Sequence, residues 1–256
     1  MTYTDTHTHI YSEKFQEDQS VMIERALASG VSRMFMPNID LDSIDGMHQL
    51  ADKYPNNCFP MMGLHPCDVK EDVEMVLSNM KNHFEWRKYL AVGEIGIDLY
   101  WDKSFLLQQE FAFRTQIEWA KEMNLPIVIH CRDAFDEILA ILDELNDDRL
   151  KGIFHCFTGT LEQAKHILGY GDFYLGIGGV VTFKKAGLDK VVEQLSINNL
   201  VLETDAPYLA PTPYRGKRNE PSYIPHIAEK VADLLGLTLK EVAEITTENS
   251  KTIFGV

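Results

Sequence analysis

Short apolar runs alternate with segments of helical periodicity along almost the whole chain, and this alternation leaves few folds open. The runs predict β-strands near residues 2–7, 32–36, 59–63, 89–94, 126–130, 152–155, 173–178 and 200–204. The strand starts lie about 28 residues apart, which leaves room for a crossover helix after each strand. Repeated strand–helix units predict an α/β protein with a parallel sheet, either closed into a (β/α)8 TIM barrel or open and doubly wound.

Composition narrows the class of protein. The chain has 256 residues without a linker or low-complexity tract, so we expect one domain over residues 1–256. The net charge of −15 argues against nucleic-acid binding over the whole surface, and a polyanionic substrate would need a local basic patch or bound cations. The cysteines show no disulfide framework, and neither a secretion signal nor a membrane span is evident. We therefore expect a cytoplasmic protein without a membrane or obligate protein partner.

Histidine and acidic residues stand where several predicted strands end. His7 and His9 are two apart, so both imidazoles project from the same face of the first strand. In a barrel, the carboxyl ends of the strands converge on the face where active sites are built. A single strand-end residue of this kind is usually a loop residue or a helix cap, whereas five strands with such endings predict a metal centre. Six ligands indicate two cations, with the ligand set His7, His9, Glu94, His130, His155 and Asp205.

Other polar residues near these strand ends have two interpretations. His65 follows the third strand and either lines the mouth of the site to contact substrate or is a turn histidine beside a proline. Asp98 is expected to orient a ligand or order a loop rather than bind metal itself. Cys131 and Cys156 each follow a candidate ligand, so strand alternation predicts that they turn away from the metals and are buried.

Two loops carry candidate substrate contacts. Arg215, Lys217 and Arg218 follow the eighth strand and form a basic cluster in an acidic chain. Their place next to Asp205 favours anion binding over the alternative of solvated surface charge. Tyr100 and Trp101 follow the fourth strand and either stack on a nucleobase or pack in the interior.

The motifs THTH, GLHP, GEIGID, IVIHCRD, HCFTG and ETDAPYLAPTPYRGKRNEP, in this order, resemble the TatD family of metal-dependent deoxyribonucleases, which are barrels of the amidohydrolase superfamily. The resemblance extends from Asp5 to Phe254 and implies the closed barrel. It also implies that His7, His9 and Asp205 hold one metal, that His130 and His155 hold the other, and that Glu94 bridges the two.

The resemblance implies a function as well. We expect hydrolysis of phosphodiester bonds in DNA, from the 3′ end of single strands, by water that two divalent cations activate. Asp205 would be the general base, and His65 with Arg215, Lys217 and Arg218 would contact the phosphates. Magnesium, manganese and zinc all suit the ligands. Two alternatives remain open: hydrolysis of an amide, ester or phosphotriester in a small molecule or in aminoacyl-tRNA, and a non-catalytic metal-binding barrel.

Overall fold

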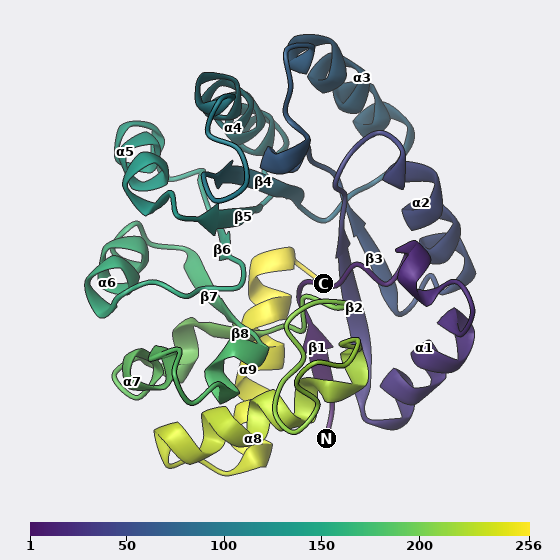
Figure 1. Ribbon diagram of the computed structural model, residues 1–256, viewed down its shortest axis with the longest axis vertical. Helices are drawn as coiled ribbons and strands as arrows, with labels where there is room; N and C mark the ends of the chain where they lie inside the picture. The colour runs from purple at the N-terminus through teal and green to yellow at the C-terminus, as the bar shows by residue number, and fades with distance from the viewer.

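The computed structural model describes the whole chain, residues 1–256. Its strands run parallel and form the wall of a barrel, with most of the helices around the outside (Figure 1). In chain order they are β1 (Tyr3–Asp5), β2 (Val31–Pro37), β3 (Cys58–Met61), β4 (Val92–Asp98), β5 (Ile127–Arg132), β6 (Gly152–Phe154), β7 (Phe173–Ile177) and β8 (Leu200–Leu202). Hydrogen bonds join them in the orders β1–β2–β3 and β4–β5–β6–β7–β8.

Backbone hydrogen bonds close the two gaps between these sheets. Between β1 and β8, the Asp205 amide donates to the His7 carbonyl at 2.9 Å, and Thr8 forms a parallel bridge with Ala206. Between β3 and β4, Met62 bridges Val92. The expected (β/α)8 barrel is therefore confirmed, and the open doubly wound sheet is excluded.

The helices and strands alternate as the apolar periodicity predicts. The α-helices are α1 (Gln19–Ala28), α2 (Ser43–Lys53), α3 (Val73–Trp86), α4 (Leu106–Met123), α5 (Phe135–Leu145), α6 (Leu161–Gly169), α7 (Leu188–Val192), α8 (Ile224–Leu235) and α9 (Leu239–Phe254). Short 3-10 helices are η1 (Glu13–Phe15), η2 (Pro66–Asp68), η3 (Gly179–Thr182), η4 (Ile197–Asn199) and η5 (Pro221–Tyr223). No helix is both long enough and apolar enough to span a membrane.

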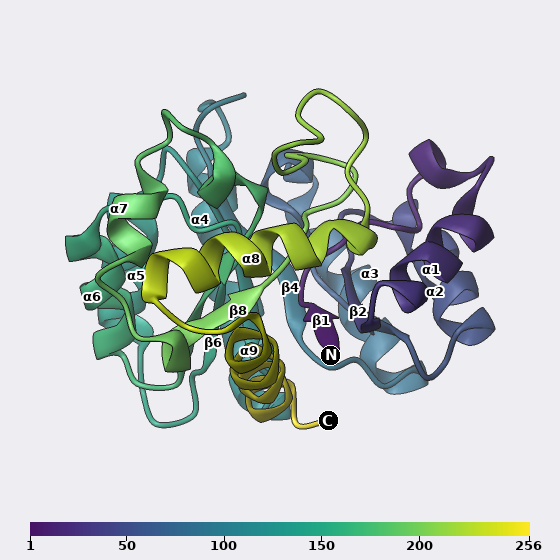
Figure 2. The same ribbon diagram turned by 90° about the horizontal axis from the view of Figure 1, so that it is seen from below.

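Alternation along each strand divides the apolar side chains between two clusters. In β5, Ile127 and Ile129 belong to the large core between the strands and the helices, whereas Val128 points to the barrel axis and belongs to a smaller cluster. The last turn of α9 closes that inner cluster, because the Phe254 ring stacks on Phe35 with a centroid distance of 3.9 Å. Figure 2 shows α9 at one end of the barrel and the long loop between β8 and α8 at the other. The open end therefore lies on the carboxyl side of the strands.

The fourth strand differs from its prediction. It begins at Val92 rather than at residue 89 and continues past Glu94 to Asp98. A β-bulge lies between Gly93 and Ile95, where β4 holds one residue more than β5 pairs with. The apolar residues before Val92 form a connection, and the alternating Ile95 and Ile97 continue the buried strand. Glu94 is thus a bulge residue within the strand, not its last residue.

Candidate metal centre

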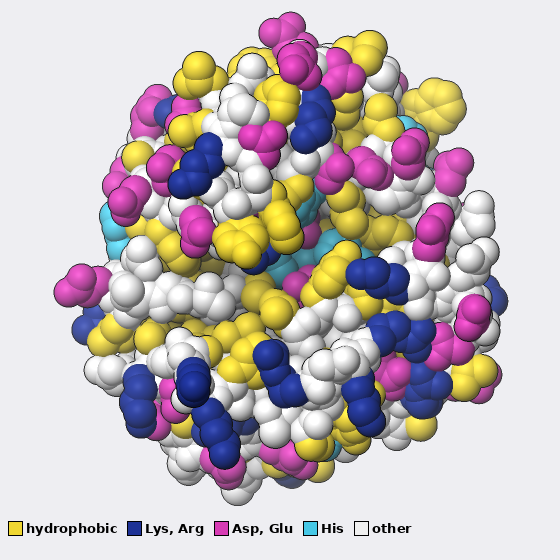
Figure 3. All heavy atoms as spheres, in the orientation of Figure 1, with side chains coloured by type: hydrophobic (Ala, Val, Ile, Leu, Met, Phe, Trp, Pro, Cys, Tyr) yellow, Lys and Arg dark blue, Asp and Glu magenta, His cyan; other side chains and the backbone are white.

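A cavity of about 620 Å³ opens at the carboxyl end of the barrel. The residues on its wall include His9, His65, Glu94, His130, His155 and Asp205. Figure 3 shows histidine side chains at the bottom of this hollow, with hydrophobic side chains along its rim. Strands β4 and β5 and the loops after β1, β3, β6 and β8 thus bring residues far apart in the sequence to one place.

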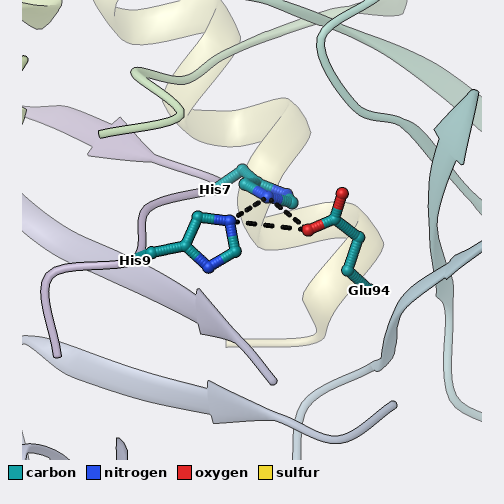
Figure 4. A group of neighbouring side chains, drawn as sticks. All are labelled: His7, His9 and Glu94. Atoms are coloured by element: carbon teal, nitrogen blue, oxygen red, sulfur yellow. Dashed lines mark hydrogen bonds and ion pairs between the residues drawn. The ribbon is translucent and has the colours of Figure 1, made fainter. Parts of the chain in front are cut away.

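One group of donor atoms surrounds Oε2 of Glu94. The Nε2 atom of His7 lies 3.1 Å from it and the Nε2 atom of His9 lies 3.5 Å from it (Figure 4). The two Nε2 atoms are 3.2 Å apart. Oδ1 of Asp205 completes the group at 3.8 Å from His7 Nε2 and 3.6 Å from His9 Nε2.

A second group surrounds the other oxygen of the same carboxylate. Oε1 of Glu94 lies 2.9 Å from Nδ1 of His130 and 3.2 Å from Nε2 of His155. His65 joins this group, since its Nε2 atom is 3.4 Å from Glu94 Oε1 and 3.3 Å from His130 Nδ1. Glu94 therefore presents one oxygen to each group. The structure brings all six predicted ligands together and adds His65 to the second group.

The donor atoms fit divalent cations. Ligands about 2.1 Å from a tetrahedral metal lie about 3.4 Å from one another, close to the separations in both groups. Oε2 of Glu94 is buried and accepts no hydrogen bond, although imidazole nitrogens surround it. Such an atom is costly to bury unless a further partner satisfies it. Imidazole and carboxylate donors suit zinc and, with a phosphate substrate, magnesium or manganese.

The charge of the site follows from its burial and its neighbours. Burial alone would raise the pKa of Glu94, but His7, His155 and His65 together hold that pKa well below its usual value. Burial lowers the pKa of His7 well below the usual value for histidine, so this imidazole is neutral. Burial raises the pKa of Asp205 to about 6, against the opposing effect of His155 and His9. Against the effect of burial, the carboxylates of Asp98, Glu94 and Glu203 instead raise the pKa of His130 and His155, so these two imidazoles would give up a proton when a cation binds.

Buried partners orient the ligand imidazoles, and the sequence prediction missed one of them. Glu203 is fully buried and its Oε1 lies 3.1 Å from His155 Nδ1 while accepting the Cys156 amide at 2.6 Å. Gly176 leaves it this room, because a Cβ atom there would come within 2.3 Å of Glu203 Oε2. An acidic residue directly after an apolar strand was the available signal. A hydrogen bond to the ring nitrogen that does not face the metal fixes the orientation of a metal-binding histidine.

Two further side chains act in the same way on other imidazoles. Oδ2 of Asp98 lies 2.8 Å from His130 Nε2, in agreement with its predicted orienting role. The hydroxyl of Tyr11 lies 3.0 Å from His9 Nδ1 and donates to the Pro37 carbonyl at 2.5 Å. The sequence prediction did not include Tyr11, although it stands two residues after His9.

The structure separates the three basic residues of the loop after β8. None of them lines the cavity. Arg218 turns toward α1 and pairs with Asp18, with Nη2 and Oδ2 2.7 Å apart. Arg215 and Lys217 are exposed and form no ion pair, and the Arg215 guanidinium lies 3.5 Å from the centroid of the Phe183 ring. Phosphate contacts by Arg215 and Lys217 stay a prediction, whereas Arg218 is engaged within the protein.

The prediction that Cys131 and Cys156 turn away from the metals and are buried holds only in part: Cys131 packs against the outer core as strand alternation predicts, whereas Cys156 departs from the prediction. Both line the cavity. Cys156 lies two residues beyond the end of β6. Its backbone is in the left-handed region, with φ of 44°, so strand alternation no longer sets the direction of its side chain. Burial and the nearby carboxylates of Asp205 and Glu203 raise the pKa of the Cys156 thiol well above its usual value. The thiol is therefore protonated and is not a nucleophile.

Comparison with known proteins assigns the family. A family model described as TatD related DNase matches residues 4–255. The uncharacterized metal-dependent hydrolase YabD of Bacillus subtilis is 42% identical over 253 residues, which cover 98% of each chain. The 3′-5′ ssDNA/RNA exonuclease TatD of Salmonella typhimurium is 34% identical, again over 98% of each chain. The crystal structure of YJJV, a TatD homolog from Escherichia coli, has a TM-score of 0.93 at 28% identity and covers 99% of this chain and 98% of its own. The chain therefore belongs to the TatD family of metal-dependent hydrolases.

Proposed function

We propose that this hydrolase is a two-metal exonuclease that removes nucleotides from the 3′ end of single-stranded DNA. The observation that carries the proposal is the position of Glu94, which offers one oxygen to each of two donor groups. Its relative from Salmonella is named a 3′-5′ ssDNA/RNA exonuclease, which supports both the direction and the substrate. His7, His9 and Asp205 would hold one cation, and His130 with His155 the other.

The cations would supply Lewis-acid chemistry: they lower the pKa of water and neutralise charge on the scissile phosphate. The chain's own residues do the rest. Asp205 lies at the cavity wall and accepts the proton of the attacking water. His65 is partly exposed to the same cavity and donates a hydrogen bond to a phosphate oxygen, where charge develops during the reaction.

The surface charge supports a narrow substrate. A chain of net charge −15 disfavours a duplex laid across its face, whereas a single-stranded end that enters the cavity exposes fewer phosphates to the acidic surface. Thr212 donates to Thr182 at 2.9 Å, which joins the loops after β7 and β8 and places Arg215 beside Phe183. These loops carry exposed cations without acidic partners, Lys184, Lys185, Arg215 and Lys217. They would hold the phosphates of the strand as it leaves the cavity.

The test is hydrolysis by chelator-treated protein reloaded separately with magnesium, manganese or zinc. The substrates are single-stranded DNA labelled at either end, RNA, and a panel of small esters, amides and aminoacyl-tRNA. We expect no activity without metal, and stepwise shortening from the 3′ end of single-stranded DNA with it. Full activity after confirmed metal loss would refute the metal mechanism. A preference for a small ester, an amide or aminoacyl-tRNA would refute the exonuclease assignment.

A further inference from the structure

Two aromatic side chains at the rim of the cavity remain exposed. Trp101 is 70% exposed and Tyr100 is 53% exposed, and Trp101 lines the cavity of the metal centre. The sequence left open whether they pack in the interior, and the structure excludes that alternative. An exposed indole contributes nothing to the core, while its flat face is available to a second aromatic ring. Its position beside the metal ligands points to a bound ligand.

Asp98 holds this aromatic pair in a fixed position. Its Oδ1 atom accepts the backbone amides of Tyr100 at 2.9 Å and of Trp101 at 3.3 Å. Its other oxygen contacts the metal-site histidine His130. A single buried carboxylate therefore connects the aromatic loop to the metal centre. The position of the loop relative to the His130 imidazole is therefore set before any substrate arrives, which favours binding because little order is lost.

Arg132 supplies a cation at the same place. Its guanidinium lies 3.7 Å from the centroid of the Tyr100 ring and 5.4 Å from that of Trp101. Arg132 is exposed, lines the cavity and forms none of the ion pairs of the protein. An arginine without an acidic partner, in a chain with fifteen more negative than positive charges, is available to an anion. Stacking on Tyr100 holds the planar guanidinium at the cavity wall.

We propose that Trp101 and Arg132 form a subsite for one nucleotide of the substrate strand, with the base stacked on the indole and a phosphate bound by the guanidinium. The inference rests on the proposed nuclease function and adds recognition of a base to it. Stacking accepts every base, so the subsite favours nucleotides over simple phosphodiesters without a sequence preference. It also selects single strands, because the base must leave its partner to reach the indole.

Fluorescence of the metal-loaded protein tests the stacking directly. Trp119 is 4% exposed and Trp86 lies at the end of α3, so the variant Trp86→Phe leaves Trp101 as the exposed reporter. We expect saturable quenching by a phosphorothioate-linked hexathymidylate, which resists cleavage. An abasic hexamer with the same linkages keeps the phosphates and should not quench. Equal quenching by both oligonucleotides, or by neither, would overturn the base-stacking site.

Kinetics with matched variants separates the subsite from the nuclease function. Trp101→Ala should raise KM for single-stranded DNA roughly 10-fold or more, as loss of one stacked base predicts. Arg132→Gln should raise it as well, and Trp86→Ala should not. With an abasic strand as substrate, Trp101→Ala should cost less than it does with DNA, because no base is there to stack, whereas Arg132→Gln should cost the same with both substrates. DNA hydrolysis that is normal in Trp101→Ala and Arg132→Gln would refute the subsite alone. No DNA hydrolysis by the parent would refute the nuclease function too.

Discussion

Glu94 shows how a single residue depends on the backbone around it. Strand alternation would give Val92 and Glu94 the same direction, and Val92 belongs to the outer core. The bulge after Gly93 adds one residue to β4, so Glu94 faces the metal centre while Ile95 returns to the outer core. The sequence predicted Glu94 as a ligand from its place after an apolar run. It could not predict the bulge, because that depends on pairing with β5.

Asp205 and His130 should respond differently to substitution. His130→Ala removes a donor atom, so metal content and activity should fall together. Asp205→Asn keeps an oxygen for coordination but accepts a proton poorly, so kcat at full metal occupancy should fall about 10²- to 10⁴-fold. Metal analysis and turnover on the same samples check this. If Asp205→Asn retains most activity at full occupancy, Asp205 is not the general base.

Glu203 should control the affinity of the metal centre without binding metal. Glu203→Ala removes the partner of His155 Nδ1 and leaves the Cys156 amide unpaired. Loss of such a partner costs roughly 10- to 100-fold in metal affinity. Glu203→Gln keeps an acceptor oxygen and should lose less. Calorimetric metal titration measures both variants, and equal affinity in Glu203→Ala and the parent would contradict the orienting role.

Elements were predicted more reliably than the contacts between them. Apolar runs placed eight strands in the right order, because each strand contains a run of mostly buried residues. Arg218 was assigned to phosphate binding because only its neighbours in the sequence were visible. In the fold it meets Asp18 at the start of α1, a contact across 200 residues that no local pattern reports.

The loop before α8 should be sensitive to acid through Glu220. Burial alone would raise the pKa of Glu220, but hydrogen bonds from Arg25 and Ser222 hold it below the usual value. The pair with Arg25 therefore stabilises the fold above the unfolded pKa of about 4.3, and this stabilisation disappears as the pH falls through the folded value. Glu220→Gln should lower the free energy of unfolding at pH 7 by about 1–2 kcal/mol.

Thermal unfolding at pH 7 and pH 3.5 measures this effect. The difference between Glu220→Gln and the parent should be clear at pH 7 and should shrink at pH 3.5. Glu229→Gln is the matched control, since the Glu229 side chain is 57% exposed and pairs only with His226. A difference between Glu220→Gln and the parent that is equal at both pH values would mean that the charge of Glu220 does not contribute.

For the whole molecule, the distribution of charge should govern substrate binding. Arg215→Ala combined with Lys217→Ala removes two unpaired cations from the loop between β8 and α8, which lies at the open end of the barrel (Figure 2). If both contact phosphates, the slope of log affinity against log salt for single-stranded DNA should become shallower by about 1.4. The control is Lys240→Ala combined with Lys251→Ala on α9, at the opposite end (Figure 2). Equal slopes in the two double variants would show that Arg215 and Lys217 are solvated charges.

The backbone hydrogen bonds that close the barrel between β1 and β8 also bear on when, during synthesis, the site can form. His7 and His9 are made first, but their strand is held in the barrel by residues near 205. The Thr204 amide donates to Asp5 at 2.9 Å, and the Asp205 amide donates to His7. During synthesis, nearly two hundred residues must therefore be added after His7 and His9 before the residues that hold their strand in the barrel are present. Because metal sites rarely exist before the fold that assembles them, we expect a fragment without β8 to bind no cation at His7 and His9 and to be inactive.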